Sequence, residues 1–553
     1  MSALTLLPLR STEIRSCGVE HSTKIAVTFE PLSWTPPSRS TRAAVGTAVA
    51  VFLCLGAFSG SVQNSTDAIY AIVARDAANG NWLAPEIAGG PYLMKPPLYF
   101  WLCAVSLKLF GGFSELFALR FPSLLSAWVV VMIGGSISGR IGRSNRAWLA
   151  GILLILLSPT VFEFSRRIFM EETLAATMLL VLYGAIRARD EDNPRWLWLV
   201  GLGSAAAILT KSYGGGFAGL AVLSWLLIVG PRRWLLSRPF LGGVAVGLAL
   251  ILLYIAVMLR VAPDEFLHQN LLPFGLRSEE QFSWYRTGSF FYFTSPLDPS
   301  RIAPPGSAGI TVLGPVLAAG IGFVGGWLAL VFGSLAARRD ASLGGLFLLL
   351  LYVGAGYLIW GSLSQQRLYY LVPFLPALSI GAATMLDRLL PSGLASTAVL
   401  AGLGGLLLVG HPRSFDPVLI DPEPALAELG QQTRGLLPEG VVIHRYNDFF
   451  AATEFYLDRR TVGMTPNPQL LADFGRILVL GERGIAVDAS HATLRRLLLE
   501  ATAEKPFFLV IGEDELRERI PGLERFLHRW AEASGWGSRR LLLLSSTPPP
   551  DGP

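Results

Sequence analysis

The residues best suited to chemistry lie in one polar segment between two apolar stretches, residues 63–116. This segment contains an acid, Asp67, at the start of a helical pattern, and a lysine, Lys95, followed by two prolines. A carboxylate can take a proton from a hydroxyl group, and a lysine on a stiff, proline-flanked segment can pair with a phosphate. Each residue also has a simpler explanation. Asp67 follows Ser65 and Thr66 and fits a helix cap, which spacing alone favours, and Lys95 fits a headgroup anchor.

Further charged and aromatic residues lie in the same segment or next to the ends of other apolar stretches. They are the basic residues Arg75, Lys211 and Arg367, the acids Glu171 and Glu172, and the ring-bearing residues Tyr70, Tyr92, His268, Tyr369 and Tyr370. Ionisable groups at membrane depth are costly and tend to be functional, although snorkelling, dipole compensation and aromatic belts explain them one at a time. Because five separate segments bring such groups to one face, we expect a pocket for a negatively charged, membrane-borne substrate.

The composition indicates a membrane protein. Of the 553 residues, 52% are hydrophobic and only 15% are charged, and the mean hydropathy is +0.49. This excludes a disordered or nucleic-acid-binding chain and disfavours an ordinary soluble enzyme, because so many apolar residues cannot all be buried in a globular core. Three cysteines without a CxxC spacing indicate neither a disulfide framework nor a thiolate zinc site.

Eleven apolar runs have the length and composition of membrane spans, which need roughly 20 mostly apolar residues. The runs lie at residues 43–62, 117–138, 147–162, 173–186, 196–210, 214–230, 239–259, 309–335, 342–361, 369–386 and 392–409. Residues 97–110 are also apolar, but the run is short and contains Lys108, so it is expected to form an interfacial or re-entrant helix. The sequence therefore predicts an α-helical polytopic membrane protein with about 11 spans.

The arginines predict the orientation of these spans. Every second loop between them contains arginines, for example Arg140 and Arg143. Because loops rich in Lys and Arg face the cytoplasm, we expect the alternate loops, notably 63–116 and 260–308, on the outside. The polar, proline-containing tail 1–42 is then cytoplasmic and disordered, and residues 43–410 form the transmembrane domain.

The last part of the chain has a different character. Its short strand-like segments are VVIHRY (441–446), RILVLG (476–481) and FFLVIG (507–512). A helical segment, 491–505, lies between the second and the third. Alternating strands and helices predict a small soluble α/β domain at 411–545. This domain is expected outside the cytoplasm, and the polar residues 546–553 form a disordered tail.

The residues of segment 63–116 follow one another in a characteristic order. They are Asp67, Tyr70, Ala74-Arg75, Gly80-Asn81-Trp82, Pro85, Gly89, Tyr92, Lys95-Pro96-Pro97-Leu98, Phe100-Trp101, Phe110-Gly111, Glu115, Leu119-Arg120 and Pro122-Ser123. This order resembles the first outer loop of the GT-C type lipid-linked-sugar glycosyltransferases, in particular the bacterial aminoarabinose lipid A transferases and their relatives among protein O-mannosyltransferases. Weaker similarity extends to LTKSYGG, DEFLHQNLLPFG, RLYYLVPFLPAL and EFYLDRR (454–460).

The resemblance implies an enzyme of the bacterial inner membrane that takes a sugar from polyprenyl phosphate and passes it to a lipid, glycan or protein acceptor at the outer leaflet. Asp67 would match the essential acid and act as general base or orient the acceptor, so that a direct displacement inverts the anomeric centre. The leaving phosphate would pair with the cations Lys95, Lys211, Arg367 and Arg75. Loop 260–308 is a candidate lid and acceptor platform.

The sequence departs from the family pattern at several positions. Ala68 stands where a second acid is common, Ile69 where arginine is common, and Met94 where some relatives have a metal-binding glutamate. Glu171 or Glu172 replaces the usual aspartate. No cofactor is therefore certain and a divalent cation stays open. Two alternatives to an enzyme also stay open, a carrier or flippase for a polyprenyl-linked saccharide and an inactive relative that only binds.

Overall fold

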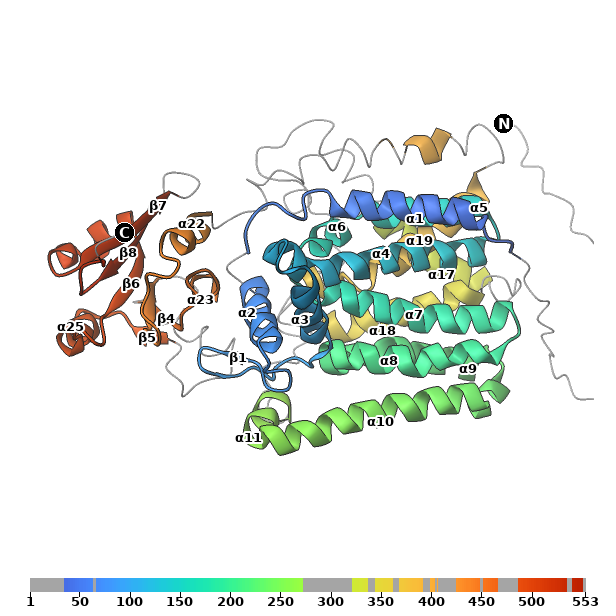
Figure 1. The fold of residues 1–553 in the computed structure, drawn as a ribbon. Helices are drawn as coiled ribbons and strands as arrows, with labels where there is room; N and C mark the ends of the chain where they lie inside the picture. The colour runs from blue at the N-terminus through green and yellow to red at the C-terminus, as the bar shows by residue number, and fades with distance from the viewer. Residues whose placement is uncertain are drawn as a thin grey trace, which may run out of the picture.

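The computed structural model describes residues 34–62, 66–271, 321–336, 344–361, 368–390, 398–402, 405, 424–447, 451–465, 486–534 and 540–550. In this part of the chain, long helices lie side by side in a bundle, and a smaller α/β unit lies beyond one end of it (Figure 1). Short elements labelled α2, β1 and α3 lie between the bundle and the α/β unit. They belong to segment 63–116, which is called the first outer loop below, after its predicted side of the membrane.

Ten described helices form the bundle. They are α1 (Arg39–Cys54), α4 (Glu115–Gly142), α5 (Asn145–Leu156), α7 (Glu171–Asp190), α8 (Trp198–Lys211), α9 (Phe217–Ile228), α10 (Arg238–Val261), α17 (Gly326–Ala336), α18 (Gly344–Gly361) and α19 (Leu375–Leu389). Of the described helices, α4 and α10 are long and apolar enough to cross a membrane by length and composition, and several others are apolar but shorter. The mainly helical architecture predicted from the sequence is present.

The interior of the bundle is close-packed, whereas its edge is apolar and exposed. Helix α7 is buried over most of its length. Helix α10 lies at the edge (Figure 1), and most of its apolar side chains are exposed, which suits contact with lipid. It packs tightly on α8 because both helices have glycine at the crossing. A Cβ atom on Gly201 would lie 2.0 Å from the backbone carbonyl carbon of Gly243.

Several helix boundaries differ from the predicted spans. Helix α1 begins at Arg39, inside the predicted tail, because Ser38 Oγ accepts a hydrogen bond of 3.0 Å from the Thr41 amide and caps the helix. It ends at Cys54, well before residue 62. The predicted run 147–162 is divided between α5 and α6 (Pro159–Ser165), since Pro159 starts a new helix at its first turn.

Two more runs differ from their prediction or are only partly described. Run 369–386 begins as a 3-10 turn, η8 (Leu368–Leu371), and becomes α-helical as α19 from Leu375. Run 309–335 is described only from Ile321, as a π-helical turn that leads into α17. Most of run 392–409, together with the tails 1–33 and 551–553, lies outside the described residues.

The first outer loop contains two helices and a small hairpin. These elements are α2 (Thr66–Ala78), β1 (Glu86–Ile87), β2 (Gly90–Pro91) and α3 (Leu98–Phe110). Helix α3 has 13 residues and is too short to cross a bilayer. One face of it is buried and the other exposes Leu102, Val105 and Leu109, as an interfacial helix would.

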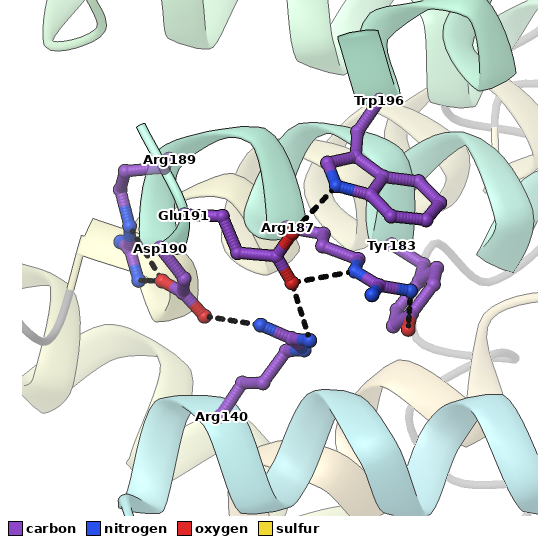
Figure 2. Close-up of polar contacts among 7 residues, drawn as sticks. All are labelled: Arg140, Tyr183, Arg187, Arg189, Asp190, Glu191 and Trp196. Carbon is purple, nitrogen blue, oxygen red and sulfur yellow. Dashed lines mark hydrogen bonds and ion pairs between the residues drawn. The ribbon is translucent and has the colours of Figure 1, made fainter. Parts of the chain in front are cut away.

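A polar network joins the helices at the bundle end far from the first outer loop, as Figure 2 shows. The guanidinium of Arg140 on α4 lies 3.5 Å from the Asp190 carboxylate and 3.1 Å from Glu191. Glu191 also accepts hydrogen bonds of 2.7 Å from Arg187 and from the Trp196 indole. These contacts hold α4, α7 and η1 (Pro194–Leu197) together at the last turns of α4 and α7. The first turns of these two helices are therefore held in a fixed relative position.

The α/β unit contains a six-stranded mixed sheet in the order β5-β4-β3-β6-β8-β7. Its strands are β3 (Ile443–Tyr446), β4 (Thr461–Thr465), β5 (Ala486–Asp488), β6 (Phe508–Gly512), β7 (His528–Ser534) and β8 (Arg540–Ser545). The first four in spatial order are parallel, and β8 pairs antiparallel with both of its neighbours, β6 and β7. Its helices are α22 (Pro424–Gln432), α23 (Ala451–Leu457), α25 (His491–Glu500) and α26 (Glu513–Arg519). Predicted strands 441–446 and 507–512 form the central pair, whereas 476–481 lies outside the described residues.

Candidate functional site

Asp67 is buried at the first turn of α2, with 3% of its surface exposed. Its Oδ2 atom lies 2.7 Å from Nη2 and 3.1 Å from Nε of Arg167, and its Oδ1 accepts a hydrogen bond of 3.0 Å from the Ile168 amide. Arg167 and Ile168 lie in the turn between α6 and α7. The structure thus joins Asp67 to the turn that precedes α7, a contact that spacing did not predict.

A buried ion pair forms where α7 begins and α8 ends. Lys211 Nζ pairs with Glu171, and both side chains are almost completely buried. The ammonium group also lies 4.7 Å from the ring centroid of Tyr370 and 5.4 Å from that of Tyr369, which is cation–π distance. Four predicted site residues from three separate segments therefore meet at this end of the bundle.

Lys95 belongs to the same cluster. Its side chain is half-buried, and no hydrogen bond or ion pair of its ammonium group is found in the described part of the chain. Desolvation, with a smaller contribution from the charge of Lys211, lowers the pKa of Lys95 to about 8, although Glu171 acts in the opposite direction. A partly desolvated lysine beside a second cation is a place where an anion binds favourably.

Aromatic rings connect Asp67's helix to the lysines. Tyr70, one turn after Asp67, contacts Phe169 at 5.6 Å between ring centroids, and Phe169 contacts Tyr369 at 5.2 Å. Tyr92 packs against Phe100 at 5.9 Å. Burial, then the charge of Glu171, raises the pKa of Tyr92 above its usual value, so its phenol stays a hydrogen-bond donor at neutral pH.

Glu172 stands beside the ion pair but is not part of it. It is completely buried, and neither carboxyl oxygen has a hydrogen-bond partner in the structure described here. A buried carboxyl group without a partner is costly. The cluster therefore contains two ionisable side chains, Lys95 and Glu172, that form no hydrogen bond or ion pair with the described residues.

Of the other predicted site residues, one points away from this cluster and two cannot be placed from the described residues. Arg75 points to the α/β unit, where its guanidinium donates a hydrogen bond of 2.9 Å to the Phe455 carbonyl and pairs with Glu115 at 2.9 Å. Arg367 lies outside the described residues, as does the side chain of His268. Most of loop 260–308 lies outside them too, from residue 272 onward.

Two amide side chains next to His268 hold the segment that leads to Lys95. Gln269 accepts a hydrogen bond of 2.7 Å from the Leu93 amide and donates one of 3.0 Å to the Pro91 carbonyl. Asn270 donates one of 2.8 Å to the Leu93 carbonyl. The sequence reasoning singled out only His268 here. Amide side chains pair with any extended backbone, so their target is visible only in the folded chain.

The described residues contain no group of three or more His, Cys, Asp or Glu side chains that could hold a metal ion. Met94, directly before Lys95, offers a thioether, which is a poor ligand for hard divalent cations such as magnesium. The lysines of the cluster, Lys95 and Lys211, are the groups that can pair with an anionic ligand.

The residues of the site, taken together, can do two things. Lys95 and Lys211 can balance a phosphate, and Asp67, held by Arg167, can accept a proton or hydrogen bond from a hydroxyl group. Both functions lie at the end of the bundle where the first outer loop covers it (Figure 1).

Comparison with protein-family models and curated sequences points to one group. Residues 94–255 match the family model "Dolichyl-phosphate-mannose-protein mannosyltransferase". The undecaprenyl phosphate-alpha-4-amino-4-deoxy-L-arabinose arabinosyl transferase 1 of Sodalis glossinidius is 30% identical over 151 residues, 26% of each chain. The corresponding transferase of Pseudomonas savastanoi is 35% identical over 78 residues, 14% of each chain. The aligned parts thus span about a quarter or less of these two relatives.

Solved structures extend the similarity over most of the chain. ArnT from Cupriavidus metallidurans in the apo state superposes with a TM-score of 0.69 at 19% identity, covering 92% of this chain and 98% of that one. The same protein bound to undecaprenyl phosphate gives a TM-score of 0.67. This chain shares their helical fold, and the resemblance to GT-C type lipid-linked-sugar glycosyltransferases predicted from the first outer loop is confirmed.

Proposed function

We propose that this protein is an integral membrane glycosyltransferase that moves a sugar from a polyprenyl-phosphate donor to a hydroxyl group of a lipid, glycan or protein acceptor. The observation that carries the proposal is the position of Lys95. This lysine has no protein partner among the described residues and lies beside the buried Lys211–Glu171 pair, at the bundle end that also holds Asp67. The names of similar proteins, which include undecaprenyl phosphate, support a polyprenyl-phosphate donor.

The chemistry follows from the charges. The acceptor oxygen attacks the anomeric carbon while the bond from that carbon to the phosphate oxygen breaks, so the anomeric centre inverts. The acceptor proton passes to the Asp67 carboxylate, which Arg167 and the Ile168 amide hold in place. The leaving polyprenyl phosphate gains negative charge, which Lys95 and Lys211 stabilise in a site with little water.

The orientation belongs to the same proposal. The network around Arg140 and Arg187 lies in the last turns of α4 and α7, whereas the site lies at their first turns, and arginine-rich ends face the cytoplasm. The site and the α/β unit are then on the outer side of the bacterial inner membrane, and the amino terminus is in the cytoplasm. About eleven spans, including those outside the described residues, would complete the transmembrane domain.

The test is turnover by the purified protein in nanodiscs. Release of polyprenyl phosphate is measured from a panel of polyprenyl-phosphate sugars with membrane extract as acceptor. We expect turnover by the wild type, a loss of roughly 100-fold or more in Asp67→Asn, and retained binding of the donor. Asp192→Asn is the matched control, because Asp192 is exposed at the opposite bundle end and its φ of 43° suits asparagine.

Two results would contradict the proposal. Donor binding without turnover, unchanged by Asp67→Asn, would favour a carrier or an inactive binding relative. Turnover that survives Asp67→Asn at the rate of Asp192→Asn would remove Asp67 from the catalytic role.

A further inference from the structure

One short segment of the α/β unit, residues 451–460, contacts the first outer loop at two places and Val62, directly before that loop, at a third. The Val62 amide donates a hydrogen bond of 2.5 Å to the Tyr456 hydroxyl oxygen, and Arg75 donates one of 2.9 Å to the Phe455 carbonyl. The Ala88 amide donates one of 3.0 Å to Glu454. Asp67 lies between the first two anchor points in sequence, and Lys95 follows the third.

Glu454 bridges the two units with a buried carboxylate. Its Oε1 accepts the hydrogen bond from Ala88, and its Oε2 accepts one of 3.0 Å from the Thr461 amide at the start of β4. Ala88 has a φ of 53°, a conformation that costs energy for a residue with a Cβ atom and persists only where surrounding contacts hold it. The turn of the β1–β2 hairpin therefore depends on a residue of the distant α/β unit.

Arg75 makes the second anchor rigid. Its guanidinium lies 4.1 Å from the Phe455 ring centroid and also pairs with Glu115, the first residue of α4. Three elements, α2, α4 and α23, thus meet at one arginine. Because α4 is fixed at its other end by Arg140, the anchor connects the loop to the rigid part of the bundle.

We infer that residues 451–460 are a positioning element that holds the first outer loop, so that Asp67 and Lys95 keep their places in the site. These residues then serve the reaction through the loop that they hold. The inference rests on the proposed function in one respect, since it takes Asp67 and Lys95 as the residues that act on the substrate. Glu454 and Arg75 are positioning residues in this arrangement.

Hydrogen exchange and lipid binding test the inference independently of turnover. In Glu454→Ala, amides of residues 86–91 should exchange roughly tenfold faster than in the wild type, and amides of β6 should be unchanged. Binding of undecaprenyl phosphate in nanodiscs should weaken roughly tenfold, because Lys95 follows the loosened hairpin. Glu513→Ala is the matched control, since Glu513 pairs with Arg517 within α26 and both changes remove one glutamate from the same unit.

A second pair of variants separates positioning from loss of folding. Glu454→Gln keeps one acceptor oxygen and should show a smaller effect on exchange and on lipid binding than Glu454→Ala. Arg75→Ala and Glu454→Ala act on the same interface, so the double variant should lose less than the sum of the two. If the wild type turns over donor, Glu454→Ala should raise KM for the donor more than it lowers kcat.

The outcomes distinguish this inference from the proposed function. Faster exchange at residues 86–91 and weaker lipid binding in Glu454→Ala support positioning, even if no sugar donor is turned over. Exchange and lipid binding equal to those of Glu513→Ala would overturn the inference, whatever the turnover. Faster exchange throughout β3 and β6 would show that Glu454 only stabilises its own unit, which also overturns it.

Discussion

Asp67 and Arg167 form a two-point ion pair in which one carboxylate oxygen contacts both Nη2 and Nε of the guanidinium, at 2.7 and 3.1 Å. The two residues come from separate segments, α2 and the turn that precedes α7. Arg167 also contacts Glu163 at 3.2 Å and lies 5.1 Å from the Phe169 ring centroid. A planar guanidinium held at several points fixes the direction of the carboxylate, which a flexible lysine would not do.

This pair predicts a loss of turnover when Arg167 is changed. Arg167→Ala leaves the buried Asp67 carboxylate with the Ile168 amide but without its cation, so kcat should fall roughly 100-fold while the donor KM changes little. Arg167→Lys should recover part of the rate. The measurement is steady-state kinetics in nanodiscs, with Arg187→Ala at the opposite bundle end as control. A rise in donor KM at unchanged kcat would contradict the role.

Lys95 predicts how lipid binding depends on pH. Its pKa is about 8 in the free protein, and a bound anion stabilises the charged form and raises that pKa. Binding therefore takes up a proton above pH 8. Affinity for polyprenyl phosphate should be constant from about pH 7 to 8, where the monoester is already mostly dianionic, and should fall up to tenfold per pH unit above 8.

Titration of binding in wild type and Lys95→Arg checks this prediction. An arginine stays charged over the whole range, so the decline above pH 8 should disappear in the variant even if its affinity is lower throughout. A decline of equal slope in both proteins would assign the effect to another group.

The Lys211–Glu171 ion pair predicts that a double substitution restores the stability of the protein but not its binding of ligand. Lys211→Met leaves a buried carboxylate without its partner and should lower the unfolding free energy by about 3 kcal/mol or more. The double variant Lys211→Met/Glu171→Gln should regain most of this stability, because no buried charge is then unpaired. Binding of polyprenyl phosphate should stay weak in both, since the cation is absent. Denaturant unfolding in detergent and lipid binding measure the two effects, and recovery of binding in the double variant would remove Lys211 from the phosphate site.

The hydrogen bonds of Gln269 predict that this residue affects lipid binding by Lys95 without contacting it. Gln269→Leu leaves the Leu93 amide and the Pro91 carbonyl without their partner, so the segment before Lys95 should loosen and polyprenyl phosphate should bind roughly tenfold more weakly. Gln432→Leu is the control, because that side chain bonds a backbone carbonyl of its own α/β unit. Equal affinities in the two variants would contradict a positioning role.

The class of the protein and the identity of most candidate residues could be predicted from local patterns. Long apolar runs allow only helices in a bilayer, and the ordered residues from Asp67 to Ser123 were specific enough to indicate the resemblance to GT-C type glycosyltransferases. Helix ends were predicted less well. The end of α1 at Cys54 and the break before Pro159 depend on caps and on packing partners as well as on hydropathy.

The grouping of the site residues depended on contacts between distant parts of the chain. Lys211 and Glu171 are forty residues apart and meet because α7 and α8 pack together, and Arg167 reaches Asp67 across a hundred residues. Arg75 carries the same charge as Lys95 and belongs to the same motif, yet it points away from the cluster to Phe455. Residue type and spacing thus determined which groups are chemically able to act. Only the tertiary structure decided which of them lie together, because that depends on how the helices and the α/β unit pack against the first outer loop.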